Sequence, residues 1–167
     1  MKKSVLLMSV LIQLLISHVA LAKPETITLL RHSEKLTGSN PSLSDIGQKR
    51  AQSLIDELSS KAVTHIFSTR YHRTEQTAAP LALARNLTVR SYDPRELTTF
   101  AEQLLAMDGH IVVVGHSNTT PKLASYLADY PADNWSESEF NTYVELVSVK
   151  DGFKASEKQM EFGQTQP

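Results

Sequence analysis

The stretch "TITLLRHSEK", residues 26–35, places a compact apolar run directly before four ionisable side chains. The run at 26–30 is rich in β-branched and large apolar residues, which predicts a short strand. Arg31 and His32 follow it at once. A strand that only had to pack would not need an arginine and a histidine at its end. This strand end is therefore the first candidate for a functional site.

Two further strands are expected to end in the same way. Residues 111–114 form a continuous β-branched run, typical of a strand buried on both faces, and His116 follows closely. The strand expected at 63–68 is followed by Arg70 and Arg73. In open α/β sheets, ligands bind outside the carboxyl ends of the strands. We therefore expect two histidines and at least two arginines to converge from three strand ends. Arg70 alone is more typical of a solvent-facing turn.

Helical patterns separate the expected strands. Ala51, Leu54, Ile55 and Leu58 are spaced for one face of a helix, with Ser44 as its N-cap. Alternating strands and helices indicate an α/β fold. We predict one domain, a three-layer sandwich in which helices cover both faces of a mixed, mainly parallel sheet. The remaining expected elements are helices at 73–86, 96–107 and 121–130, a strand at 87–92, and a hairpin around Asp151 and Gly152.

Two prolines lie inside expected helices. Pro80 removes a backbone hydrogen bond and should kink or reset its helix. Pro121 suits the first turn of the next helix, with Thr119 or Thr120 as the cap.

The composition limits the class of protein. The chain has 167 residues, which favours a single domain. It carries 17 Lys and Arg against 18 Asp and Glu, a balance that argues against a nucleic-acid-binding protein. No cysteine is present, so no disulfide supports the fold.

The first 22 residues have the pattern of a secretory signal peptide. Lys2 and Lys3 precede a short apolar run at 5–16, and Ala20 and Ala22 form an A-x-A-like cleavage site. The alternative is a membrane anchor, but the run is shorter than the ~20 residues that a span needs. We expect cleavage after Ala22, which leaves a single domain at 23–167 with net charge −3. We also expect this domain to be in the periplasm or the medium, with no stable membrane anchor.

The converging side chains favour an anionic ligand. Arginine forks match the oxygens of phosphate, and helix N-termini add inward-pointing N–H groups. A neutral histidine can attack phosphorus, so phosphoryl transfer without a metal or other cofactor is expected. The alternative is a zinc site built from His32 and His116. The adjacent arginines disfavour a cation there.

Three blocks of the sequence resemble the histidine phosphatase superfamily, in its phosphoglycerate-mutase-like branch. They are "LLRHSEK", "STRYHRTEQTAAPLA" and "VVVGHSNT", in the family's order and at fitting separations, and "LSDIGQKRAQ" resembles the family's first helix. The resemblance covers roughly residues 25–150. It implies the phosphoglycerate-mutase-like fold, and the short chain is most similar to single-domain bacterial members, here with an export signal.

The resemblance also implies roles for four residues. His32 corresponds to the nucleophile that becomes phosphohistidine, and Arg31 to a phosphate clamp. Arg73 occupies the arginine position of the second block. His116 corresponds to the second histidine, which binds the phosphoryl oxygens. Ser33, where many members have glycine, is expected either to bind phosphate or to cap the next segment.

The proton donor is less clearly indicated. The family often places a glutamate after the third strand, which here is Glu96, with Asp93 as the alternative and Glu34 as a third candidate. A carboxylic acid with a raised pKa would protonate the leaving oxygen. Asn118 completes the expected phosphate contacts.

The sequence therefore predicts an exported phosphatase that hydrolyses phosphomonoesters or phosphohistidine through a phosphohistidine at residue 32. The expected substrate is a phosphorylated sugar, glycolipid head group or protein. Two alternatives stay open: a phosphate-binding or regulatory module with little turnover, and a phosphotransferase or mutase on the same scaffold.

Overall fold

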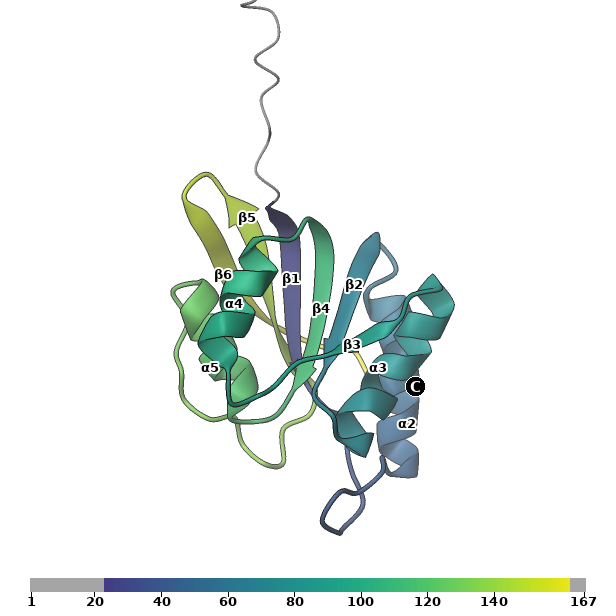
Figure 1. Cartoon of the computed structure of the whole chain (residues 1–167). Helices are drawn as coiled ribbons and strands as arrows, with labels where there is room; N and C mark the ends of the chain where they lie inside the picture. The colour runs from purple at the N-terminus through teal and green to yellow at the C-terminus, as the bar shows by residue number, and fades with distance from the viewer. Residues whose placement is uncertain (1–22, 163–167) are drawn as a thin grey trace, which may run out of the picture.

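The computed structural model describes residues 23–162 (Figure 1). The signal-peptide prediction falls on residues 1–22 and lies outside this range. Within the range, no helix is long and apolar enough to cross a membrane. The elements in chain order are β1 Pro24–Arg31, α2 Asp45–Glu57, β2 Val63–Ser68, α3 His72–Arg85, β3 Val89–Ser91, α4 Leu97–Leu105, β4 Gly109–Gly115, α5 Thr119–Leu127, β5 Thr142–Val149 and β6 Gly152–Gln159.

The strands form one mixed sheet in the order β3-β2-β4-β1-β5-β6. The first four strands of this order are parallel, and β5 and β6 are antiparallel. The hairpin predicted at Asp151 and Gly152 is confirmed: Val149 pairs with Gly152, whose φ of +134° suits glycine. The predicted α/β fold with a mainly parallel mixed sheet is therefore confirmed.

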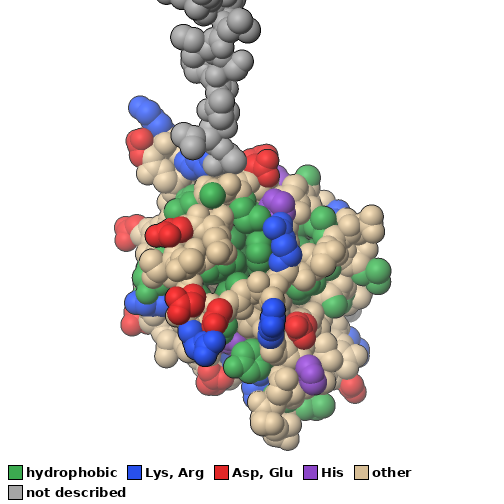
Figure 2. Space-filling view, viewed as in Figure 1, with side chains coloured by type: hydrophobic (Ala, Val, Ile, Leu, Met, Phe, Trp, Pro, Cys, Tyr) green, Lys and Arg blue, Asp and Glu red, His purple; other side chains and the backbone are tan. Residues whose placement is uncertain are grey.

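Helices cover both faces of the sheet (Figure 1). Neighbouring residues of the central strands enter opposite cores: Leu29 and Val113 pack on the side of α4 and α5, whereas Leu30 and Val114 pack on the side of α2 and α3. Successive strand side chains alternate between faces, so a strand covered on both sides needs a continuous apolar run. On the face that Figure 2 shows, basic and acidic side chains are intermixed.

The helix boundaries confirm some expectations and correct others. Ser44 is the N-cap of α2, and its hydroxyl accepts the N–H of Gly47. Pro80 was predicted to kink or reset its helix, and the reset is wrong, because α3 runs unbroken from His72 to Arg85. Pro80 and Gln76, four residues earlier, are both at least partly exposed, so water can replace the one backbone bond that proline removes.

The start of α5 differs from the predicted cap. Asn118 is the N-cap, and Thr119 and Thr120 lie in the first turn. Their hydroxyls have other partners: that of Thr119 accepts the N–H of His116 at 3.1 Å, and that of Thr120 donates to the carbonyl of Leu30 at 3.3 Å. Both threonines therefore tie this helix to the ends of the two central strands.

Gly47 allows α2 to approach the segment that follows β1. A Cβ atom at this position would lie 2.0 Å from the backbone carbonyl oxygen of Glu34. No side chain fits at that distance without a backbone shift. Glu34 is also held to the same helix by Arg50, whose guanidinium donates to its carboxylate at 2.7 Å.

We predict that Gly47→Ala lowers the free energy of unfolding by about 1–3 kcal/mol, because the added methyl group must displace the Glu34 backbone. Urea denaturation measures this change. Lys49→Ala, at an exposed position of the same helix, is the control and should leave stability nearly unchanged. A Gly47→Ala protein as stable as the wild type would contradict the close approach.

Candidate active site

The parallel pairing of β1 and β4 brings the two histidines together. Arg31 lies opposite Gly115, and the backbone N–H of His32 donates to the Gly115 carbonyl at 3.0 Å. The residues that follow each strand are thus neighbours at the carboxyl edge of the sheet. The rings of His32 and His116 meet edge to face, with 5.6 Å between their centroids.

His32 is held as a neutral imidazole. The side chain is buried, and Nδ1 lies 2.8 Å from the carbonyl oxygen of Ser33. A carbonyl only accepts, so Nδ1 carries the proton and Nε2 presents a lone pair. Burial, followed by the charges of Arg31 and Arg73, lowers the pKa of His32 to about 3. Among residues 23–162, Nε2 has no hydrogen-bond partner.

His116 has the opposite tautomer. Arg73 approaches its Nδ1 at 3.4 Å, and a guanidinium only donates, so Nδ1 accepts. Nε2 then donates to the hydroxyl of Thr69 at 3.0 Å. The Thr69 hydroxyl in turn contacts the hydroxyl of Thr74 at 2.9 Å. Burial, followed by Arg73, lowers the pKa of His116 to about 4. Both histidines are therefore uncharged at neutral pH.

Arg73 lies in the first turn of α3 and stacks on Tyr71. Its guanidinium carbon is 4.5 Å from the centre of the Tyr71 ring, and the same ring meets His116 edge-on at 5.2 Å. The stack positions the guanidinium beside the second histidine. Burial lowers the pKa of Arg73, but an arginine stays charged in a protein.

A cavity of about 570 Å³ opens over these side chains. Four of the predicted site residues line it: His32, Arg73, His116 and Asn118. Ser33 does not line it, since the residue is buried and its N–H donates to the Thr77 hydroxyl at 2.9 Å. The full lining is His32, Lys35, Tyr71, Arg73, Pro94, Arg95, His116, Ser117, Asn118, Thr119, Asn134 and Glu137.

Arg31 faces the segment between α5 and β5 and does not line this cavity. Its guanidinium donates to the backbone carbonyls of Ser136 and Glu139, each at 2.9 Å, and to the carboxylate of Glu137 at 2.7 Å. The side chain is 1% exposed. In this structure Arg31 anchors a connecting segment, and its role as a phosphate clamp stays a prediction.

Glu137 is a site residue that the sequence reasoning missed. It is the one carboxyl group in the lining of the cavity, and its side chain is 76% exposed. The hydroxyl of Ser117 donates to it, and this contact, followed by the charge of Arg31, lowers its pKa. Its surroundings in the sequence, "NWSESEFN", match no motif that would have indicated it.

The three carboxyl groups expected as proton donors lie elsewhere. Asp93 forms a short ion pair with Arg95 at 2.6 Å, and hydrogen bonds from Arg95 lower the pKa of this carboxyl to about 2. Glu96 is the N-cap residue of α4 and does not line the cavity. Glu34 is paired with Arg50. None of the three lines this cavity, although Asp93 lines the cavity beside it, and their role as proton donors stays a prediction.

The zinc alternative lacks a third ligand. Over the described range, no group of three or more histidine, aspartate or glutamate side chains is arranged to hold a metal ion. His32 and His116 instead have arginine guanidinium groups as neighbours.

Solved structures with this fold include phosphatases. A putative phosphohistidine phosphatase SixA from Nakamurella multipartitia matches with a TM-score of 0.63 and 19% identity, covering 82% of this chain and 96% of that one. A mycobacterial glucosyl-3-phosphoglycerate phosphatase matches with a TM-score of 0.60 and 14% identity, covering 81% and 97%. A protein histidine phosphatase SixA complexed with tungstate matches with a TM-score of 0.60 and 13% identity, covering 80% and 96%.

At these identities the likenesses show the fold alone, and they confirm the predicted phosphoglycerate-mutase-like architecture. No curated protein sequence matches the chain. The model of the histidine phosphatase superfamily, branch 1, matches residues 27–95, the segment that contains Arg31, His32 and Arg73. Over these residues the chain is similar to this branch of the histidine phosphatase superfamily.

Proposed function

We propose that this chain is an exported, metal-independent phosphatase that hydrolyses phosphomonoesters or phosphohistidine through a phosphohistidine at His32. One observation supports the proposal above the others. His32 is buried and neutral, and its protonated Nδ1 is tied to a carbonyl, so that the lone pair of Nε2 is available for attack. Export rests on the sequence of residues 1–22.

The reaction has two displacements. In the first, Nε2 of His32 bonds to phosphorus while the bond to the ester oxygen breaks. In the second, water attacks the phosphohistidine, the N–P bond breaks, and inorganic phosphate leaves. Arg73 binds the equatorial phosphoryl oxygens, and His116 does so once a bound dianion has favoured protonation of its Nδ1. The N-terminus of α5 adds N–H groups beside Asn118.

We assign the proton transfers to Glu137. Its pKa is low in the empty pocket, but a phosphate dianion beside it would favour the neutral carboxylic acid. The protonated carboxyl can then donate to the leaving oxygen, and the resulting carboxylate can accept a proton from the attacking water. This assignment replaces Glu96 and Asp93, which do not line the cavity that contains His32.

The names of the structural relatives support two substrate classes. SixA proteins are named as phosphohistidine phosphatases, and the mycobacterial relative as a glucosyl-3-phosphoglycerate phosphatase. For an exported chain we propose phosphorylated sugars, glycolipid head groups or proteins as substrates. Cytoplasmic phosphorelay proteins are disfavoured by export.

We predict that His32→Ala lowers kcat for p-nitrophenyl phosphate by at least about a thousandfold, because the nucleophile is lost. Acid quenching should trap a phosphorylated protein in the wild type and none in the variant. Arg73→Ala and His116→Ala should lose most activity, while a chelator should have no effect.

His65→Ala is the matched control, since His65 lies on β2 away from the cavity. Full turnover by the His32→Ala protein would contradict the mechanism. Phosphate binding without any turnover would favour the regulatory module. Transfer of the phosphoryl group to an acceptor other than water would favour the phosphotransferase.

We predict that Glu137→Gln acts mainly on substrates with poor leaving groups. The loss in kcat/KM should be about a hundredfold for phenyl phosphate and much smaller for p-nitrophenyl phosphate, whose more acidic phenol leaves without a proton donor. The measured quantity is the ratio of the two kcat/KM values.

Glu96→Gln and Asp93→Asn decide between the candidate acids. Neither should change this ratio, because neither side chain lines the cavity of His32. If either variant changed the ratio while Glu137→Gln did not, the proton donor would be that residue and the assignment to Glu137 would be wrong.

We predict that stability falls as the pH falls from 6.5 towards 4. The folded-state pKa values of His32 and His116, about 3 and about 4, lie below the ordinary 6.5. The unfolded chain therefore binds more protons in this range, and acidification favours it. Urea denaturation between pH 4 and 7 should show a shallower pH dependence in His32→Asn and His116→Asn proteins. An unchanged slope in both would contradict the neutral histidines.

A further inference from the structure

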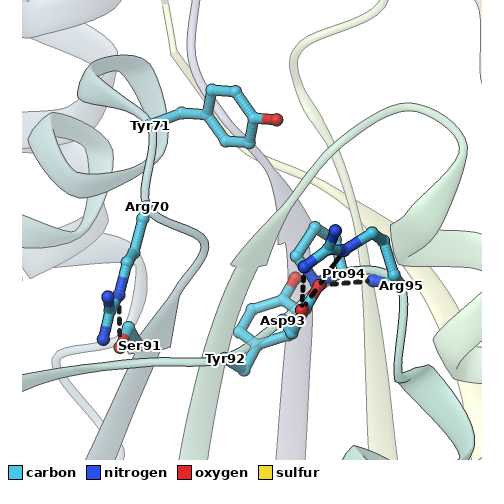
Figure 3. Close-up of a pocket in the computed structure, with 7 residues that line it drawn as sticks. All are labelled: Arg70, Tyr71, Ser91, Tyr92, Asp93, Pro94 and Arg95. Atoms are coloured by element: carbon cyan, nitrogen blue, oxygen red, sulfur yellow. Dashed lines mark hydrogen bonds and ion pairs between the residues drawn. The ribbon is translucent and has the colours of Figure 1, made fainter.

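A second cavity, of about 560 Å³, adjoins the candidate active site (Figure 3). Both cavities are lined by Tyr71, Pro94 and Arg95, so these three residues form a shared wall. A volume of this size is typical of a site for a small molecule. The second cavity is lined by Arg70, Tyr71, Ser91, Tyr92, Asp93, Pro94 and Arg95.

Tyr71 lines both cavities. Its ring contacts Arg73 and His116 in the cavity of His32, and the residue also lines the second cavity. A group bonded to a phosphate at His32 can therefore extend past Tyr71 into the second cavity. Tyr71 and Pro94 offer apolar faces against which the C–H face of a sugar ring can pack.

Of the two arginines that line the second cavity, Arg95 has a carboxylate partner and Arg70 does not. Arg95 binds Asp93 through Nε and one terminal nitrogen, and both side chains are well exposed, so this pair is nearly neutral. Arg70 donates from Nε to the Ser91 hydroxyl at 3.2 Å and has no carboxylate partner among residues 23–162. Figure 3 shows the guanidinium of Arg70 across the hollow from the Asp93–Arg95 pair.

An exposed arginine is often only a solvated surface residue. Arg70 differs because it borders a cavity that shares a wall with a phosphate-binding pocket. The two terminal nitrogens of its guanidinium form a fork that matches a carboxylate or phosphate. The second cavity thus has a positive charge without a carboxylate partner among residues 23–162, and it shares a wall with the cavity of His32.

We propose that the second cavity, the Arg70 subsite, binds the leaving group of the substrate and that Arg70 binds a second oxyanion on that group. This rests on the proposed phosphatase function and narrows its substrate class. The preferred substrate is a sugar-sized phosphomonoester that also carries a carboxylate or a second phosphate. A monoester with an uncharged leaving group occupies the subsite without this ion pair.

Equilibrium binding tests the subsite with matched ligands. Glucose 1-phosphate and glucuronic acid 1-phosphate differ only in a carboxylate at carbon 6, and glucose 1,6-bisphosphate carries a phosphate there. Titration calorimetry uses the mature chain, residues 23–167, with the substitution His32→Asn, so that no ligand is hydrolysed. We expect glucuronic acid 1-phosphate, glucose 1,6-bisphosphate or both to bind about tenfold more tightly than glucose 1-phosphate. Whichever gains more identifies carboxylate or phosphate as the second group.

Arg70→Ala, added to this protein, should reduce the gain to less than about twofold while inorganic phosphate binds as before. Arg90→Ala is the matched control, because Arg90 is exposed on β3 outside both cavities. The same preference should appear in wild-type protein as inhibition of p-nitrophenyl phosphate hydrolysis. Equal affinity for all three ligands, or a gain that survives Arg70→Ala, would overturn the proposal.

The outcome is separate from that of the proposed function. If the wild type hydrolyses no phosphomonoester but the Arg70-dependent gain is present, the phosphatase proposal fails and the subsite stands. If the wild type hydrolyses p-nitrophenyl phosphate but shows no Arg70-dependent gain, the reverse holds.

Discussion

The register between β1 and β4 is the constraint on which the site depends. Arg31 pairs with Gly115, and the first residues beyond the two strands, His32 and His116, are therefore neighbours. A shift of one residue in either strand would turn alternate side chains to the other face and separate the imidazoles. The apolar residues that alternate between two cores make such a shift costly, so the cores that stabilise the sheet also set the geometry of the chemistry.

Most of the fold could be predicted because its signals are local and repeated. Strand runs of β-branched residues, helical spacing, the Ser44 cap and the turn at Gly152 are each encoded in a few adjacent residues. The errors lie where one local rule was given too much weight. Pro80 was expected to kink or reset a helix that in fact continues unbroken, and the cap of α5 was placed one or two residues late.

The convergence of His32, Arg73 and His116 could be predicted because each follows an expected strand, and ligands bind outside the carboxyl ends of strands in open α/β sheets. The contacts of Arg31 could not. Two of its three partners are backbone carbonyls, which have no signature in a sequence, and the third, Glu137, lies in a connection without periodicity. The Arg70 subsite was missed for a similar reason, since a cavity depends on the distance between segments and not on any motif.

The neutral state of the two histidines also links anion binding to proton binding. Desolvation keeps His116 uncharged while the pocket is empty, but a phosphate dianion beside it favours the imidazolium. The pocket would then take up an ester and a proton together. Its affinity for a phosphate ester would therefore rise as the surroundings become more acidic, until the ester itself is protonated. The burial that prepares His32 for attack thus makes occupancy of the site responsive to the acidity of its compartment.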